Sequence, residues 1–416
     1  MKISSALCTG CGTCAGVCPT DAISMSLNKG LGILMPVVDE TKCVRCNLCD
    51  KVCPGKKVEI DALSQRFFRR GRKSELLGSY ISCYIGYAAD TQLRYMATSG
   101  GIVSAVLLYC LNEGIIDGAL VTGVRGVLPK PFIARSSSEI ISAAGSKYCP
   151  VPVNIMLKEI LKVKGRYAAV GLPCHIQGLR RAEMHVRSLK ERIVLHIGLF
   201  CGEMTSFLGT EFFLKRLGIN IREVADIRYR GEGWPGICRI LLRGGKELKL
   251  PFFGGFWTWG VFFFLPLRCS FCTDVTSELA DISCGDAWLP EIKKTDRLGT
   301  SIIIARSEFG KQVLTDASRK GYIRLKRKDP RKVVEAQFGA FVFKKYDIGA
   351  RLQLLKRLGI PTPDYEREIR SGSLLSYLKA MALYAGMLTA TYRLWPLIRL
   401  YINIRSLLRS SANSSS

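Results

Sequence analysis

The sequence predicts an α/β (α+β) body with a small cysteine-rich module in front of it and a helical tail behind it. Three observations lead to this prediction: a cysteine pattern that occurs twice, an alternation of short apolar strands and helices, and a final stretch that is apolar, aromatic and basic at once. The predicted segments are the cysteine module at 1–60, a basic linker at 61–78, the body at 79–350 and an amphipathic helical tail with a disordered end at 351–416.

The composition is that of a folded and strongly basic protein. Hydrophobic residues make up 48% and charged residues 23% of the chain, which excludes wholesale disorder, collagen-like repeats and a polytopic membrane protein. The 61 Lys and Arg residues against 34 Asp and Glu leave a net charge of +27. This excess is larger than solubility requires, so we expect the protein to bind something anionic.

Cysteine usage indicates metal ligation in a reducing compartment. The chain has 17 Cys and only 3 His, and its first cysteine is already Cys8. No signal peptide fits before Cys8, and disulfide-rich scaffolds are short secreted domains. We therefore expect a cytoplasmic protein whose cysteines bind metal.

The first of these cysteine sets is an internal duplication. The segments CTGCGTCAGVCP, from Cys8, and CVRCNLCDKVCP, from Cys43, share the spacing C-x2-C-x2-C-x3-C-P. This is the spacing of bacterial ferredoxins with two 4Fe-4S clusters, in which the fourth cysteine of each run binds the other cluster. The predicted ligands are Cys8, Cys11, Cys14 and Cys53 for one cluster, and Cys43, Cys46, Cys49 and Cys18 for the second. The alternative, two structural zinc sites, does not require the x3-C-P ending.

The body follows as alternating strands and helices, an order that favours α/β or α+β layering. We expect strands near 80–88, 118–123, 167–172, 193–200, 239–250 and 299–305, with helices at 101–112 and 154–163.

Four of the nine remaining cysteines lie where ligands would be expected. Cys174 follows a strand in AAVGLPCHIQGLRR, Cys201 ends one in IVLHIGLFCGE, and Cys269 and Cys272 form the C-x2-C pair of RCSFCTD. Strand ends in open sheets are common places for sites. On the residues alone, Cys174 and Cys201 fit a buried hydrophobic role equally well.

Several motifs resemble one known family. The stretches YMATSGGIVSAVL, AAGSKY, GLPCHIQGLRR, LFCGE, YRGEGWPG and RCSFCTDVTSELADISCGDAW occur in this order within residues 80–345. They resemble the family of coenzyme F420 hydrogenase/dehydrogenase beta subunits, and with the preceding module the whole chain resembles the input subunit of F420H2 dehydrogenases. The resemblance implies an FAD-binding flavoprotein body and a third 4Fe-4S cluster held by Cys174, Cys201, Cys269 and Cys272.

The chain departs from the family pattern in two places. His175 stands where the family often has glutamine, and the tail from Ser371 lies outside the pattern. The other five cysteines are interpreted as ordinary thiols: Cys83, Cys110, Cys149, Cys238 and Cys284.

FAD is also expected on chemical grounds, because reduced coenzyme F420 gives up a hydride whereas a cluster accepts one electron. The chain contains no G-x-G-x-x-G or Walker A loop for the pyrophosphate. The expected flavin contacts are Thr98, Ser99, Gly100 and Gly101 at a helix start, Lys147 as a point charge, and the turn Gly285 and Asp286. A plain helix cap, a solvated lysine and a structural turn remain the alternatives. No catalytic residue is assigned, because the hydride transfer requires no protein base.

The resulting functional prediction is an oxidoreductase that passes electrons between reduced coenzyme F420 and a redox partner protein through FAD and three 4Fe-4S clusters. The alternatives are a ferredoxin-dependent reductase of another organic substrate and a non-catalytic electron-wire subunit. Basic runs at 66–73, 180–192 and 319–332 suit an acidic electron carrier or an anionic membrane. Nucleic acid is excluded as a partner because no recognition motif occurs.

The tail is expected to lie at a membrane surface, at the inner face of the cell membrane, or on the protein itself. Residues 380–392 are uncharged, but this stretch is shorter than the roughly 20 residues that span a bilayer. An interfacial helix or helical hairpin and a helix pair packed on the body are the two alternatives.

Overall fold

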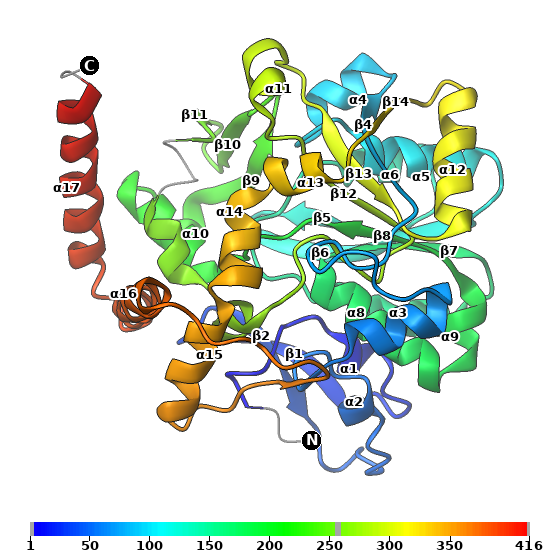
Figure 1. Cartoon of the computed structure of the whole chain (residues 1–416), viewed down its shortest axis with the longest axis horizontal. Coiled ribbons are helices and arrows are strands. Elements are labelled where there is room, and N and C mark those ends of the chain that lie inside the picture. The colour runs from blue at the N-terminus through cyan, green and yellow to red at the C-terminus, as the bar shows by residue number, and fades with distance from the viewer. Residues whose placement is uncertain (1–3, 254–258, 414–416) are drawn as a thin grey trace.

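The computed structural model describes residues 4–253 and 259–413, and its centre is a mixed eight-stranded sheet (Figure 1). In spatial order the strands are β14 (Ile323–Lys328), β4 (Ser82–Ala88), β13 (Ser301–Ala305), β12 (Ile282–Asp286), β8 (Ile193–Leu199), β7 (Tyr167–Gly171), β5 (Gly118–Arg125) and β6 (Leu128–Ala134). The four strands β12, β8, β7 and β5 run parallel, and the strands on either side are antiparallel to their neighbours.

Helices cover both faces of this sheet, which explains why strands such as β13 read as continuous apolar runs. One face packs against α5 (Ile102–Asn112) and α12 (Glu308–Arg319), and the other against α8 (Pro173–His185). The smaller helices of the body are α4 (Thr91–Met96), α6 (Ser137–Ser142), η1 (Val153–Met156), α7 (Leu157–Lys162), α9 (Arg187–Arg192), α11 (Pro290–Thr295), α13 (Arg331–Ala336) and α14 (Phe338–Phe341). The predicted mixed α/β body is confirmed.

A second, antiparallel sheet extends the body on one side. It comprises β9 (Val224–Gly231), β10 (Ile237–Leu242) and β11 (Glu247–Pro251). Its apolar face, with Ile227, Tyr229 and Ile240, is covered by Phe213 and Leu214 of α10 (Phe207–Arg216). The short η2 (Ile221–Glu223) connects α10 to this sheet.

The N-terminal module lies against the α8 face of the body. It contains α1 (Thr13–Gly16), β1 (Ile23–Asn28), β2 (Ile33–Val38), α2 (Leu48–Lys51), β3 (Lys57–Val58) and α3 (Ile60–Phe68). The contact is close, because a Cβ on Gly178 of α8 would lie 2.3 Å from Oγ1 of Thr13. The buried Asn154 side chain donates both to Thr13 Oγ1, at 2.8 Å, and to the carbonyl of His175, at 2.9 Å. Module and body therefore share a buried, hydrogen-bonded interface.

The chain after the body returns to the N-terminal module. Strand β15 (Asp364–Tyr365) pairs in parallel with β3, and the side chain of Glu366 accepts hydrogen bonds from the first backbone amides of α3. The segment predicted as a linker, 61–78, contains most of α3 and the side chain of Arg72, which pairs with Asp61 and Glu278.

Three helices end the chain: α15 (Ile348–Arg357), α16 (Leu374–Thr391) and α17 (Trp395–Asn413). In the described part of the chain, no helix is both long enough and apolar enough to cross a membrane. Trp395 and Ile398 pack with Phe212 and with Phe264 of η3 (Trp259–Phe264), so one side of the tail is part of the body's core. Residues 414–416 of the predicted disordered end lie outside the described residues.

Beneath the sheet lies a fully buried network of four charged groups. His196 of β8 contacts Glu183 through Nε2, at 2.5 Å, and Asp281 through Nδ1, at 3.0 Å. The guanidinium of Arg180 donates to the same two carboxylates. Burial alone would lower the pKa of His196, but the two carboxylates outweigh burial and Arg180, so its pKa lies above the usual value.

We expect His196→Gln to lower stability most at mildly acidic pH. The raised pKa means that the imidazolium contributes fully below its unfolded-state pKa of about 6.5, and that this contribution is lost as the pH rises through the folded-state pKa. Breaking such a buried pair costs about 3 kcal/mol, so for a chain of 416 residues the melting temperature at pH 6 should fall by roughly 3–4 °C. Melting curves across pH measure this. His185→Gln is the control, because His185 is exposed. If His196→Gln lowers the melting temperature by the same amount at every pH, the proposal that His196 is charged in the folded protein is wrong.

Candidate functional site

Four cysteines from three separate segments of the body line one cavity, which Thr9, Val58 and Ile60 of the N-terminal module also line. Cys174 lies in the first turn of α8 and Cys201 follows β8, so both stand at the carboxyl ends of neighbouring parallel strands. Cys269 lies in η4 (Leu267–Phe271) and Cys272 directly follows it. The structure thus brings together the four body cysteines that the sequence motifs singled out.

The donor set of this cavity fits an iron-sulfur cluster. Burial, with the other thiols nearby, raises the pKa of Cys201 to about 12 and that of Cys269 to about 11, and it raises that of Cys174 well above its usual value. Thiolate is the ligand that iron-sulfur clusters use, and cysteine side chains release their protons when they bind a metal, so four cysteines grouped in one cavity suit a cluster.

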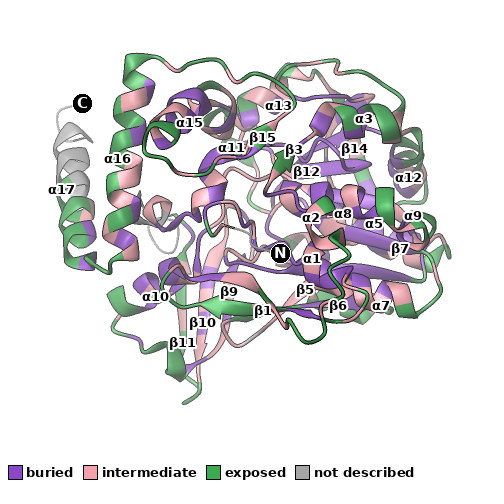
Figure 2. Ribbon diagram, turned by 90° about the horizontal axis from the view of Figure 1, so that it is seen from below, coloured by how far each residue is buried: buried purple, intermediate pink, exposed green. Residues whose placement is uncertain are grey.

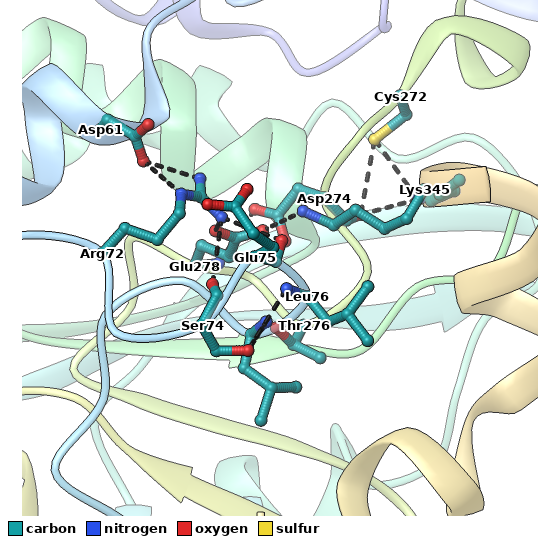
Figure 3. Close-up of polar contacts among 12 residues, drawn as sticks. Asp61, Arg72, Ser74, Glu75, Leu76, Cys272, Asp274, Thr276, Glu278 and Lys345 are labelled. Carbon is teal, nitrogen blue, oxygen red and sulfur yellow. Dashed lines mark hydrogen bonds and ion pairs between the residues drawn. The ribbon is translucent and has the colours of Figure 1, made fainter. Parts of the chain in front are cut away.

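Two adjacent lysines beside the cavity have different partners. Lys344, which is buried in the π-helical turn η5 (Val342–Tyr346), donates to Cys272 Sγ at 3.3 Å and to the carbonyl of Asp274 at 2.9 Å. Lys345 instead pairs with the carboxylate of Glu278 at 2.7 Å (Figure 3). Within the described residues, no carboxylate forms an ion pair with Lys344.

The N-terminal cysteines form the continuation of this site. Burial is the largest cause that raises the pKa of Cys8, Cys14 and Cys53, and Cys11 raises the pKa of each of them further. Cys53 also raises the pKa of Cys8 and Cys14, so the four cysteines form one group. Cys53 of the second repeat thus stands with three cysteines of the first. Cys11 also raises the pKa of Cys174, after burial, so this group and the body cavity are neighbours.

The second predicted set reaches the surface of the module. Its members Cys18, Cys43 and Cys49 are half-buried and Cys46 is exposed, next to the exposed Val44. Across residues 4–253 and 259–413, no three His, Cys, Asp or Glu side chains are grouped so as to hold a single metal ion. A cubane differs from such a site because its four thiolates surround four irons.

The segments predicted to contact flavin come together at one end of the sheet. Oγ1 of Thr98 accepts from the amide of Ser146, at 2.6 Å, next to Lys147. Oγ of Ser99 donates to the carbonyl of Thr300, at 3.1 Å, and the neighbouring Ser301 pairs in β-register with Asp286.

Gly100 and Gly101 have structural reasons to be glycine. A Cβ on Gly100 would lie 2.6 Å from the carbonyl oxygen of Gly86 and 2.7 Å from the amide of Ser301, so the glycine lets the helix start approach β4 and β13. Gly101 has a φ of 75° at the N-terminus of α5. A bulky substitution at Gly100 would therefore disturb the sheet itself, whether or not a phosphate binds there.

Lys147 and Arg228 form a concentration of positive charge beside these segments. The ammonium of Lys147 donates to the carbonyls of Ala143 and Gly145, and burial together with Arg228 lowers its pKa to about 8. Arg228 is half-buried, and burial lowers its pKa as well. Two partly buried cations this close repel one another and would be stabilised by an anion.

The sequence analysis missed the partners of Asp286. Its carboxylate accepts two hydrogen bonds from Arg230, both at 2.9 Å, and one from Nε1 of Trp234, at 2.8 Å. Trp234 stacks on Trp288 with ring centroids 4.5 Å apart, and both line an open cleft with Pro235, Phe253 and Lys293. The stretches YRGEGWPG and CGDAW carry these residues, but their spacing gives no sign that they pair.

The flavin candidates and the cysteine cavity are adjacent. A Cβ on Gly285 would lie 2.4 Å from the ring of Phe200, and the amide of Phe200 donates to the carbonyl of Cys284. Cys201 follows Phe200 directly. The ends of β8 and β12 therefore connect the cysteine cavity to Asp286, which accepts a hydrogen bond from Trp234 of the aromatic cleft.

Models of known families match most of the chain. The model described as "Coenzyme F420 hydrogenase/dehydrogenase, beta subunit N-term" matches residues 83–158, and the model of the C-terminal part of the same beta subunit matches residues 164–331. Together they cover more than half of the chain. A 4Fe-4S dicluster domain matches residues 7–57.

Individual relatives agree with these matches. The coenzyme F420 hydrogenase subunit beta of Methanothermobacter thermautotrophicus is 29% identical over 311 residues, which are 69% of this chain and 99% of the relative. The F subunit of the F(420)H(2) dehydrogenase of Methanosarcina mazei is 25% identical over 320 residues, covering 74% and 81% of the two chains.

A solved structure shares the fold. A chain in a xenon-derivatised structure of the F420-reducing NiFe hydrogenase complex from Methanosarcina barkeri superposes with a TM-score of 0.55 at 23% identity, covering 70% of this chain and 97% of that chain. These findings confirm the dicluster domain and the family resemblance of the motifs. With both parts of the family model matched in order, the chain belongs to the family of coenzyme F420 hydrogenase/dehydrogenase beta subunits.

Proposed function

We propose that this protein is an oxidoreductase that exchanges a hydride with coenzyme F420 at a bound FAD and passes the electrons singly, through three 4Fe-4S clusters, to a partner protein. The observation that carries the proposal is the cavity lined by Cys174, Cys201, Cys269 and Cys272, to which the paired ends of β8 and β12 connect Asp286 and near which Cys11 lies. FAD supplies the conversion between two-electron and one-electron chemistry when bound.

The arrangement of the cysteines supports one order of electron carriers. We propose that the body cavity holds the cluster nearest the flavin, that Cys8, Cys11, Cys14 and Cys53 hold the next, and that Cys18, Cys43, Cys46 and Cys49 hold the last. The electrostatic influence of Cys11 on Cys174 supports the first step of this order, and the exposure of Cys46 supports the exit to a partner.

We propose that Lys147 and Arg228 bind the phosphates of FAD, next to Thr98 and Ser99. Their positive charge, without a carboxylate ion pair among the described residues, supports an anionic ligand. We place the flat ring of coenzyme F420 at the cleft of Trp234 and Trp288, because aromatic faces suit a planar ring and Lys293 suits its anionic tail. Arg230 and Trp234 hold the Asp286 carboxylate at the edge of this cleft.

Rapid anaerobic mixing with F420H2 tests the proposal. We expect the absorbance of the bound flavin to bleach in the same phase in which oxidised F420 appears, followed by bleaching of the clusters. A flavin that stays oxidised with F420H2 but is bleached by a reduced ferredoxin would favour the alternative, a reductase of another substrate. Purified protein that binds iron but no flavin would favour the other alternative, a non-catalytic electron-wire subunit.

A further inference from the structure

The C-terminal helices expose an apolar face that the body does not use. Figure 2 shows α16 along one edge of the molecule, with both exposed and buried positions. Within a stretch of about 30 residues lie 11 of the 25 large hydrophobic side chains that are exposed in the described chain. One of the 11, Tyr401, packs its ring on that of Phe263, with the centroids 5.5 Å apart. The other ten define the tail surface: Leu374, Leu375, Leu378, Met381, Leu388, Tyr392, Leu394, Leu397, Leu400 and Ile404. A concentration of this kind marks an interaction site.

The opposite side of the same helices packs on the body through Gly386, Ala390, Trp395 and Ile398, which holds the tail surface in position. A Cβ on Gly386 of α16 would lie 2.1 Å from the ring of Phe263, which shows how closely the helix approaches η3. Trp395 donates from Nε1 to the carbonyl of Ala390, at 3.0 Å, and its ring meets that of Phe212 edge-on at 5.8 Å. The exposed residues therefore remain after the helices have packed.

The charge of this segment is of one sign. Residues 371–416 contain no Asp or Glu, whereas five cations occur among them: Lys379, Arg393, Arg399, Arg405 and Arg409. Lys379 pairs with Asp347, and Arg393 pairs with Glu211. The exposed Arg399 donates to the backbone carbonyl of Lys215, and it pairs with no carboxylate among the described residues. Apolar side chains with interspersed cations and tyrosines are typical of helices that lie at a bilayer surface.

We propose that the tail surface docks the protein on an anionic lipid bilayer, with the apolar side chains inserted among the acyl chains and the cations at the headgroups. Charge complementarity selects this occupant. A second copy of the chain would bring two carboxylate-free, cationic segments together, which electrostatics opposes. The insertion does not require a spanning helix, in agreement with the absence of one from the described residues.

Sedimentation of the full-length, anaerobically prepared protein with vesicles tests this proposal. We expect binding to vesicles of phosphatidylglycerol and phosphatidylcholine, and weaker binding to phosphatidylcholine alone. The triple variant Leu378→Ser, Met381→Ser, Leu388→Ser should bind the anionic vesicles about tenfold more weakly or worse, because each side chain loses its apolar transfer energy. Raised salt should weaken the wild-type binding without abolishing it, since insertion is not screened.

A matched triple variant gives the control. Leu128→Ser, Ile141→Ser and Met184→Ser change side chains of similar exposure elsewhere on the body, and should leave vesicle binding unchanged. Iron content and melting temperature show that both triple variants are folded. The proposal is overturned if the wild type does not sediment with anionic vesicles, or if both triple variants lose binding equally. It is also overturned if the wild type is a dimer without lipid and only the tail variant is a monomer.

Discussion

Replacing Cys269 with serine is expected to remove about a third of the protein's iron, from about twelve to about eight atoms per chain, because one of three cubanes is lost. Cys269 lies in the cavity with Cys174, Cys201 and Cys272, and neither N-terminal group of cysteines includes it. Reduction of the flavin by F420H2 should persist, whereas reduction of a dye at the N-terminal module should fall to background. Iron analysis and the two assays measure these effects separately.

Cys284→Ser is the matched control for this experiment. Cys284 is buried, whereas the cavity cysteines are partly buried, and burial alone raises the pKa of Cys284, to about 12, with no contribution from other thiols. Its replacement should leave about twelve irons in place. Equal losses of iron from Cys269→Ser and Cys284→Ser would show that the ligands of the body cluster are wrongly assigned, and a parent protein with about eight irons would remove the third cluster altogether.

The second large effect is a change in the reduction potential of one cluster when Lys344 is replaced. A 4Fe-4S cluster becomes more negative on reduction, so a buried cation beside its thiolate stabilises the reduced form. Burial would lower the pKa of Lys344, but the thiolates of Cys201, Cys272 and Cys269 outweigh burial and raise it, which keeps the ammonium charged. For a unit charge about 7 Å from the cluster and an effective dielectric of about 20, the interaction is about 2 kcal/mol.

Lys344→Met should therefore lower the potential of one cluster by on the order of 100 mV, since about 59 mV corresponds to a tenfold change for one electron. A redox titration followed by electron paramagnetic resonance resolves the clusters and shows which one shifts. Lys344→Arg, which keeps the charge, should restore most of the potential.

The adjacent residue supplies a control in the same helical turn. Lys345 is directed to Glu278 and not to a cysteine, as Figure 3 shows, so Lys345→Met should leave all three potentials unchanged. Equal shifts in the two variants would mean that any change in this turn disturbs the cluster. An unchanged potential in a folded Lys344→Met protein with full iron would contradict the assigned role.

Local spacing explains which parts of the site the sequence predicted. The eight cysteines of the duplication lie within residues 8–53, so their pattern could be read without knowing the fold. Cys269 and Cys272 are likewise a local pair. Cys174 and Cys201 required the resemblance, because only the parallel pairing of β7 with β8 brings their strand ends together.

The partners of these residues could not be read from the sequence. Lys344 follows Cys272 by about 70 residues, and no periodicity connects a lysine in a π-helical turn to a distant thiol. Arg230 and Asp286 pair across two different sheets. The basic run 180–192 was interpreted as a surface for partners, yet Arg180 is buried in the His196 network, because a run of charges does not tell which side of a helix faces the core.

The pairing of β3 with β15 imposes an order on the biosynthesis of the protein. The second strand leaves the ribosome about 300 residues after the first, and Glu366, which caps α3, follows it. The duplicated cysteines, in contrast, are all present once residue 53 has emerged. The N-terminal cysteines can thus bind iron on a nascent chain, while the body cavity must wait for residues 174 to 344, and β15 joins the module only when about the last eighth of the chain arrives. Under the proposed function, iron-sulfur assembly would then proceed from the exit end of the proposed electron path towards its flavin end.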